Sequence, residues 1–143
     1  MSEQPVEKLS AEQIQAAFDA SPFLGFLRLR VVALDHETDT LTVSMPMRPE
    51  LERRLGTGQF HGGPIAAFID SVGDYAIGMA VGGGVPTINL RIDYLRPAVG
   101  SVLTGTARVR RAGRTVALVD VDVYDEQRVL VAVGRGTYSG QRG

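Results

Sequence analysis

Residues 61–64, His-Gly-Gly-Pro, carry the first pattern that could support chemistry. Pro64 suits the first turn of a helix, because its missing N–H would have no partner there. The two preceding glycines let a ligand approach the backbone closely, and they present free amides at the positive end of that helix. Such amides could hold developing negative charge, for example the oxyanion of a thioester under attack. The alternative is that these residues form only a tight turn.

Asp70 is the second candidate, because it lies within an apolar stretch. Burying a carboxylate costs free energy unless the group is paired or functional. It is either a reactive group or an aspartate satisfied by Ser71, Thr87 or a donor from another chain. Asp74 follows one helical turn later on nearly the same face. The two carboxylates could couple and raise one pKa, unless Asp74 reaches solvent.

The spacing of these two candidates restricts how they can cooperate. Eight residues separate Gly62 from Asp70, which is about 12 Å along one helix. An oxyanion donor and an attacking group must both lie about 3 Å from one reacting carbonyl. One chain therefore cannot supply both, whereas two antiparallel helices related by a dyad could. We expect an active site shared across a homodimer and present twice.

A helix over residues 64–81 must position both candidates, and Gly82, Gly83 and Gly84 are expected to end it. It is apolar on most faces, so it belongs inside the fold rather than on its surface. As a membrane span it is too short and contains two aspartates. A shorter helix over 10–20 begins with a capping box of Ser10 and Gln13, followed by a packed turn.

Alternating apolar and polar residues predict six strands, as expected for an antiparallel sheet with one buried face. The expected strands are 27–34, 41–47, 88–94, 103–110, 119–123 and 129–138, and residues 48–60 are expected to form a loop. A curved sheet wrapped round the apolar helix would bury it. The helix's outer face would still need a partner, which again favours a dimer.

Composition narrows the classes of function. The chain has 143 residues, enough for one domain with a real core, and no cysteine. A disulfide scaffold, a thiolate zinc site and a cysteine nucleophile are therefore excluded. A net charge of −1 argues against nucleic acid as the main partner. The N-terminus lacks the pattern of a signal peptide, so we expect a soluble cytoplasmic protein without a membrane partner.

Two segments together resemble a known family. HGGPIAAFID at 61–70, followed by TINLRIDYLRPA at 87–98, is similar to the hotdog-fold thioesterases of the PaaI-like group, which is related to phenylacetate degradation. The resemblance runs from about residue 20 to the C-terminus, so we divide the chain into a helical extension over 1–20 and a hotdog thioesterase domain over 21–143. It implies an α+β fold, with an antiparallel sheet around one central helix, and dimers that join their sheets edge to edge.

The resemblance also implies roles for individual residues. Gly62 matches the backbone oxyanion donor, and Asp70 matches the general base or nucleophile. Thr87 matches a hydroxyl that orients the water or the carboxylate, and His61 matches the motif histidine. The implied reaction is hydrolysis of an acyl-CoA thioester without a metal or cofactor. Asp70 would either activate water or attack to form a mixed anhydride.

One departure from the family concerns the lytic water. The family often has an asparagine six residues before the histidine, where this chain has Leu55. Gln59 is the nearest amide and could substitute.

Arginines are the expected ligands for the phosphates of coenzyme A. The chain has 14 arginines and a single lysine, Lys8, and arginine forks suit phosphate. Arg108, Arg110, Arg111 and Arg114 surround one predicted hairpin, and Arg96 lies in a turn. The alternative for each is a solvated strand face. We assign Gly63, Gln59, Arg96, Arg111 and Arg114 to substrate binding.

Other functions remain possible at this stage. A hotdog hydratase or dehydratase would use a different acidic motif, and a non-catalytic acyl-CoA-binding domain would fit the loss of the water-holding asparagine. Ser71 lacks the G-x-S-x-G setting of a serine hydrolase. His36 lies in a charged turn and is expected to be solvated. Phe60, Phe68 and Tyr75 line an acyl pocket or belong to the core. Pairing of dimers into tetramers is also open.

Overall fold

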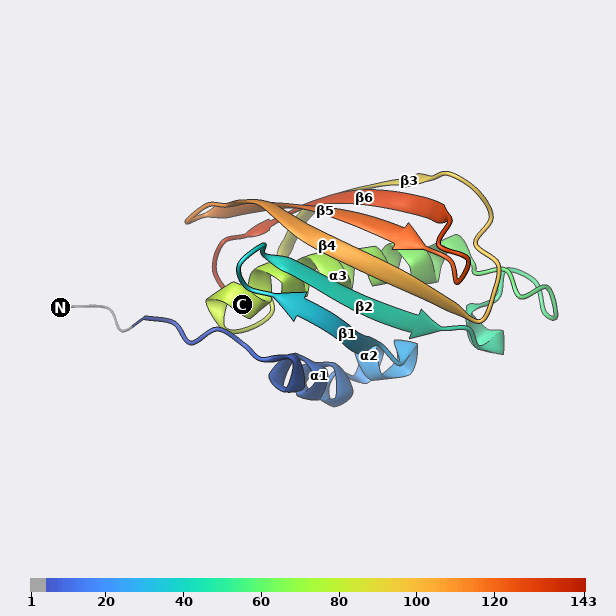
Figure 1. The fold of residues 1–143 in the computed structure, drawn as a ribbon, viewed down its shortest axis with the longest axis horizontal. Helices are drawn as coiled ribbons and strands as arrows, with labels where there is room; N and C mark the ends of the chain where they lie inside the picture. Colours follow the sequence, from blue (N-terminus) through green and yellow to red (C-terminus); the bar gives the residue numbers. More distant parts are fainter. Residues whose placement is uncertain (1–4) are drawn as a thin grey trace.

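A single antiparallel sheet wraps one long helix in the computed structural model, which describes residues 5–143 (Figure 1). The strand order is β1–β2–β4–β5–β6–β3, and every neighbouring pair is antiparallel. The strands are β1 (Arg30–Asp35), β2 (Thr40–Pro46), β3 (Thr87–Tyr94), β4 (Val102–Ala112), β5 (Val116–Tyr124) and β6 (Leu130–Ser139). The predicted α+β hotdog arrangement is confirmed. Residues 1–4 of the predicted N-terminal extension lie outside the described residues.

The helix α3 (Gly62–Val81) is the centre of the core. Phe68, Ile69 and Val72 on this helix are fully buried, and the helix packs against β2, β4, β5 and β6. The helix begins at Gly62, two residues before the predicted start, because the His61 side chain caps it. Gly82 ends it in the left-handed conformation, as expected. By length and composition alone α3 would be long and apolar enough to cross a membrane.

Glycines in the sheet let α3 approach closely. A methyl group at Gly134 would overlap the side chain of Ile69. Tyr138 projects from β6 into space left by Gly136 on its own strand and Gly73 on the helix. Tyr138 is fully buried despite its size. These positions therefore fix the distance between the helix and the sheet.

The N-terminal helices close one side of the core. In α1 (Ala11–Ala20) the Ser10–Gln13 capping box is present as predicted, and Ile14 and Phe18 are fully buried. Residues expected to form a packed turn and the start of a strand are instead α2 (Pro22–Leu27), and β1 begins only at Arg30. Ser21 caps α2 and Pro22 occupies its first turn, so the local signal is one for helix initiation.

Two further expectations are corrected. The 48–60 loop contains a short 3₁₀ helix, η1 (Pro49–Leu51), which places Leu51 in the core. His36 is half-buried rather than solvated, because its Nε2 forms a 2.8 Å hydrogen bond with the carbonyl oxygen of Leu9. The N-terminal segment thus folds back onto the turn between β1 and β2.

Candidate active site

The beginning of α3 presents one unengaged amide. The amide of Gly63 donates to Nδ1 of His61 at 2.9 Å, so the prediction that both glycine amides are free is wrong for Gly63. Within residues 5–143 the Gly62 amide donates to no acceptor. The hydroxyl of Tyr94 donates to the carbonyl oxygen of Gly62 at 2.7 Å, which ties β3 to this turn. His61 thus stabilises the helix start, while the Gly62 amide stays available.

An open hollow of about 320 Å³ lies beside Gly62. Two predicted substrate-binding residues, Gln59 and Arg96, line it, and so do the aromatic rings of Phe60 and Tyr94. Leu55 is 80% exposed on the preceding loop. Leu55 does not line this hollow, whereas Gln59, the amide expected to substitute for the family's asparagine, does.

Asp70 is half-buried and hydrogen-bonded by Thr87. The Thr87 hydroxyl donates to Oδ1 of Asp70 at 2.7 Å, although 17 residues separate them in sequence. Ser71 donates instead to the carbonyl of Ala67, so it does not satisfy Asp70. The buried hydroxyl of Tyr138 donates to the backbone carbonyl of Asp70 at 3.0 Å. Asp70 is thus held at its backbone from β6 and at its side chain from β3.

Asp74 does not reach solvent freely. Its Oδ1 accepts a 2.6 Å hydrogen bond from the Val85 amide. The pKa of Asp74 is raised from 3.8 to about 6, because the effects of burial and of the Asp70 charge together exceed the opposing effect of the Val85 hydrogen bond. One of the two carboxylates thus has a raised pKa, to which burial contributes most and the charge of Asp70 less.

The two groups of candidate residues remain apart within one chain. Gly62 and Asp70 lie on the same unbroken helix, so their separation along it is about 12 Å, as expected from the spacing. The hollow at Gly62 does not include Asp70 or Thr87. Within one chain, the amide of Gly62 and the carboxylate of Asp70 are therefore too far apart to act on the same reacting carbonyl.

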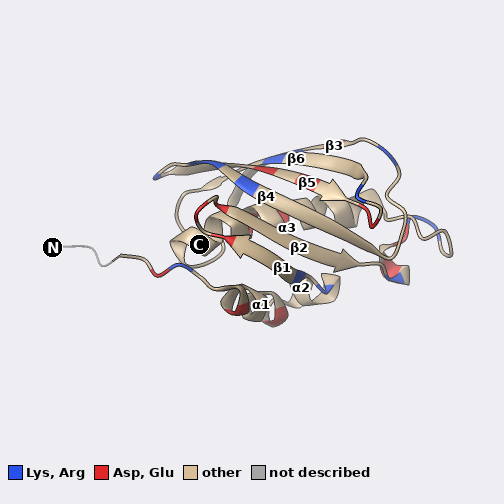
Figure 2. Ribbon diagram, viewed as in Figure 1, with Lys and Arg blue, Asp and Glu red and all other residues tan. Residues whose placement is uncertain are grey.

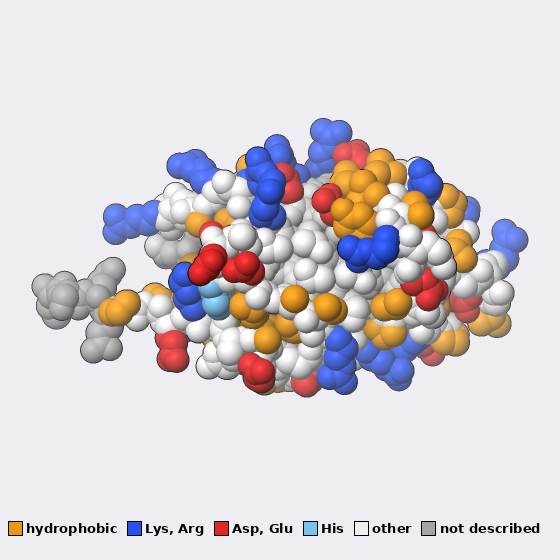
Figure 3. Space-filling view, in the orientation of Figure 1, with side chains coloured by type: hydrophobic (Ala, Val, Ile, Leu, Met, Phe, Trp, Pro, Cys, Tyr) orange, Lys and Arg blue, Asp and Glu red, His pale blue; other side chains and the backbone are white. Residues whose placement is uncertain are grey.

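The arginines predicted to bind phosphate lie at two different places in the structure. Arg114 borders an apolar cavity of about 390 Å³ between the C-terminal end of α3 and the β4–β5 hairpin, far along the helix from Arg96. Basic residues colour the ribbon at that hairpin in Figure 2, and basic side chains project there in Figure 3. Arg110 lies 3.6 Å from Asp120 and belongs to a solvated strand face. A β-bulge between Val109 and Arg111 shifts the register, so Arg111 pairs with Leu118 and is exposed, as Arg110 is.

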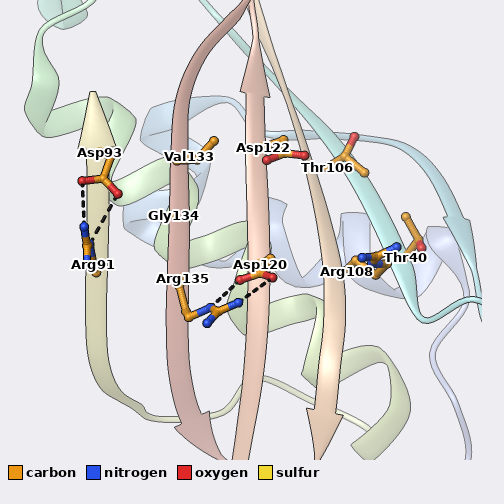
Figure 4. A pocket seen from close by; sticks show the side chains of 10 residues that line it. All are labelled: Thr40, Arg91, Asp93, Thr106, Arg108, Asp120, Asp122, Val133, Gly134 and Arg135. Carbon is orange, nitrogen blue, oxygen red and sulfur yellow. Dashed lines mark hydrogen bonds and ion pairs between the residues drawn. The ribbon is translucent and has the colours of Figure 1, made fainter. Parts of the chain in front are cut away.

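A hollow of about 570 Å³, larger than the other two, lies on the outer face of the sheet (Figure 4). Arg108 lines it, and an Arg135–Asp120 pair with hydrogen bonds of 2.7 and 3.0 Å crosses it. This pairing holds the pKa of Asp120 below its usual value. Its arginines and aspartates balance in charge, and none of the predicted catalytic residues borders it. We therefore place the candidate active site at α3 instead.

All three aromatic candidates lie in the core or pack against it. Phe68 packs into the space at Gly105, and Tyr75 makes an edge-on contact with Phe18 at 5.0 Å between ring centroids. Only Phe60 is both buried and at the hollow. Among residues 5–143, no three histidine, aspartate or glutamate side chains gather closely enough to hold a metal ion.

Three contacts of the site were not foreseen from the sequence. Tyr94 binds Gly62, Tyr138 binds the Asp70 backbone, and Val85 binds Asp74. Tyr94 lies within the 87–98 motif, so its position in that motif was an available signal. No local pattern marked Tyr138 or Val85.

Comparison with known proteins finds similarity to thioesterases and esterases. The family model of the thioesterase superfamily matches residues 57–132. A Halobacterium salinarum protein that carries the name of an esterase is 34% identical over 140 residues, covering 90% of this chain and 91% of that protein. Acyl-coenzyme A thioesterase 13 of Mus musculus is 30% identical over 79% of this chain and 83% of its own length. The solved structure of a phenylacetic acid degradation-related protein from Ralstonia eutropha is 27% identical, with a TM-score of 0.75, and the match covers 87% of this chain and 97% of that one.

Proposed function

The chain belongs to the thioesterase superfamily and is a PaaI-like hotdog thioesterase, and from that premise we propose that it hydrolyses acyl-coenzyme A thioesters at a site shared between two copies of the chain. Thioester hydrolysis follows from the family. The acyl-coenzyme A substrate, the residue roles and the shared site are the proposal. The observation that carries it is the 2.7 Å hydrogen bond between Thr87 and Asp70 on a helix that begins with a free Gly62 amide.

In the proposed reaction the thioester carbonyl lies between Asp70 of one copy and Gly62 of the other. Water attacks the carbonyl carbon while Asp70 accepts its proton, and the oxygen that becomes negative is held by the Gly62 amide. The carbon–sulfur bond then breaks, and coenzyme A leaves as the thiol after taking up a proton. Attack by Asp70 itself, through a mixed anhydride that water later hydrolyses, uses the same groups. Neither route requires a metal or cofactor.

The remaining predicted residues have supporting places in this scheme. Gln59 borders the hollow at Gly62 and is the amide proposed to hold the water. His61 keeps the helix start in the conformation that presents the Gly62 amide, through its bond to the Gly63 amide. Arg96 lines the same hollow and is proposed to bind a phosphate.

A dyad also explains how Arg111 and Arg114 could reach the same ligand. If the two α3 helices run antiparallel with Asp70 of one beside Gly62 of the other, the C-terminal end of the first helix lies about 16 Å beyond that point. The arginine-bearing hairpin of the copy that supplies Asp70 would then lie on the outer side of the other copy's Gly62 hollow. Coenzyme A is a long molecule, so arginines at both places suit its separate phosphates.

The test is release of free thiol from a panel of short, medium-length and aryl acyl-coenzyme A esters. The protein is expected to release coenzyme A, and Asp70→Asn is expected to lower kcat at least about 100-fold. Asp122→Asn is the matched control, because Asp122 is an exposed aspartate on the outer sheet face. Hydration of an unsaturated ester without thiol release would indicate a hydratase instead. Tight binding without any reaction would indicate a non-catalytic binding domain.

A further inference from the structure

Asp74 is a half-buried carboxylate that the proposed reaction does not use. It lies one helical turn after Asp70 on α3 and accepts the Val85 amide at 2.6 Å. Val85 is itself 5% exposed and lies just before Thr87, the residue that donates to Asp70. Both carboxylates therefore bind the same short segment that leads into β3.

The spacings of the two hydrogen bonds match. Asp70 and Asp74 are four residues apart, or about 6 Å along the helix. Val85 and Thr87 are two residues apart, which is about 6.6 Å in extended chain. The segment runs antiparallel to the helix, so Asp74 meets Val85 and Asp70 meets Thr87. We define these two hydrogen bonds as the double clasp.

Within the double clasp, the hydrogen bond between Val85 and Asp74 restricts the position of Thr87, which donates to Asp70. Pro86 between the two attached residues restricts the backbone, so the position of Val85 limits where the Thr87 hydroxyl can lie. The Pro86 carbonyl also accepts from the Ser139 amide at 2.8 Å, which holds the segment against β6. Thr87 is exposed and has no other side-chain hydrogen bond among the described residues. The orientation of the Thr87 hydroxyl toward Asp70 therefore depends on the hydrogen bonds that hold the backbone at Val85 and Pro86.

From this geometry we propose that Asp74 is a positioning residue for the thioesterase reaction, because its carboxylate anchors Val85 and so holds Thr87 against Asp70. The inference rests on the proposed function, since Asp70 must be the reactive carboxylate. It adds a second acidic residue to the site, one that acts through Thr87 and Asp70 rather than on the substrate.

The surroundings of Asp74 make this anchoring depend on pH. The groups that face it are Asp70 and Tyr75 from α3 and Tyr138 from β6. Arg142, from the C-terminal segment, donates to the carbonyl oxygen of Gly82 at 3.4 Å and lies beside Gly83. Burial raises the pKa of Asp74 to about 6. Above that pH the ionised carboxylate of Asp74 binds the Val85 amide more strongly.

Steady-state kinetics from pH 4.5 to 8.5 on wild type, Asp74→Asn and Asp74→Ala test the proposal. Asp74→Ala is expected to lower kcat about tenfold with KM within about twofold, because the anchor is lost. Asp74→Asn keeps an acceptor for the Val85 amide but cannot ionise. It should therefore retain more activity than Asp74→Ala, and the midpoint of its acidic limb should fall by about one pH unit or more. A midpoint unchanged in Asp74→Asn would overturn the proposal, as would full activity in Asp74→Ala.

Amide NMR on the unliganded protein separates this proposal from the proposed function. The Val85 and Thr87 resonances are expected to titrate together near pH 6 in wild type, and to lose that step in Asp74→Asn. This readout needs no turnover, and it remains decisive if Asp74→Ala does not fold. If wild type released no thiol while both resonances titrated, the proposed function would fail and the double clasp would stand. If wild type were active but Thr87 did not respond, the positioning role would be refuted.

Discussion

Thr87 is the residue through which sheet and helix meet at Asp70. Its hydroxyl makes a charge-assisted hydrogen bond of 2.7 Å, and such bonds are worth about 1.5–3 kcal/mol. In the proposed reaction this bond orients the carboxylate toward water or the thioester. Losing it should therefore affect turnover more than substrate binding.

Replacing Thr87 by valine is expected to lower kcat about 10- to 100-fold while KM changes little, because valine keeps the shape and removes the donor. Thiol release by purified variants measures the effect. Thr87→Ser is the matched control, since serine restores a hydroxyl at the same place. Equal losses in the valine and serine variants would show that the hydroxyl is not what matters.

Asp74 should also make the protein's stability depend on pH. Its folded pKa of about 6 lies above the usual 3.8, so the folded state binds its proton more tightly than the unfolded state does. The associated stability is present below about pH 4 and is lost as pH rises through 6. Each tenfold change in proton affinity corresponds to about 1.4 kcal/mol, so the full change is about 3 kcal/mol.

The difference in unfolding free energy between Asp74→Asn and wild type isolates this effect. Between pH 4 and pH 8 it should shift by about 2.4 kcal/mol in favour of the asparagine variant, because asparagine carries no charge to bury. Urea denaturation at several pH values measures it, with Asp122→Asn as the control. A constant difference across that range would contradict the raised pKa of Asp74.

At the scale of elements, the site depends on how closely α3 approaches the sheet. Gly134 on β6 leaves space for Ile69, the neighbour of Asp70. Gly73 and Gly136 leave space for Tyr138, whose hydroxyl binds the Asp70 backbone. Small residues in both layers thus keep the helix carrying Asp70 within reach of β6 and of Thr87 on β3.

Gly134→Ala is expected to destabilise the fold by about 1–3 kcal/mol, because the added methyl group overlaps Ile69 in a fully packed core. Urea denaturation gives the value. Gly56→Ala is not a suitable control, since Gly56 has a positive φ of 83°. Ala132→Gly on the same strand controls for altered strand propensity instead. An alanine variant as stable as wild type would mean that helix and sheet can separate without cost.

At the scale of the whole molecule, a shared site predicts that two inactive chains can restore each other. Gly62→Pro removes the amide donor, and proline suits that first helical position. Asp70→Ala removes the carboxylate. In a mixed dimer both defects fall in one site, and the other site has a wild-type Gly62 and a wild-type Asp70.

Each variant alone is expected to be inactive, and subunits exchanged at equal amounts should recover about one quarter of wild-type activity. Half of the dimers are mixed under random exchange, and each mixed dimer has one intact site of two. Thiol release before and after exchange measures this recovery, and mixing each variant with itself is the control. No recovery after verified exchange would place the whole site within one chain.

The hairpin arginines make the second prediction at this scale. Arg111→Glu combined with Arg114→Glu should raise KM for an acyl-coenzyme A ester while sparing a short thioester that lacks the nucleotide, because only the former carries the phosphates. The comparison of the two substrates supplies its own control. Arg110→Glu should have little effect by this route, since Arg110 pairs with Asp120 on the outer face. Equal losses on both substrates would refute phosphate binding by this hairpin.

The sequence alone determined the features that depend on local periodicity and capping. The apolar run at α3, the alternation in the strands and the Ser10–Gln13 box each encode an element, so the sheet around a buried helix was predictable. The rise per residue of a helix also set the separation of Gly62 and Asp70. The sequence-based prediction was wrong at α2, where Ser21 and Pro22 start a helix in a segment expected to form a packed turn.

Only the tertiary structure decided which donors meet which carboxylates. Thr87 lies 17 residues from Asp70, Val85 lies 11 from Asp74, and Tyr138 lies 68 from Asp70. Such contacts depend on strand order, register and the depth at which the helix packs, and none of these is fixed by a local pattern. The bulge before Arg111 likewise shifts the pairing of β4 with β5. The residue types that can react are thus visible in the chain, but their partners, burial and pKa follow from packing between distant segments.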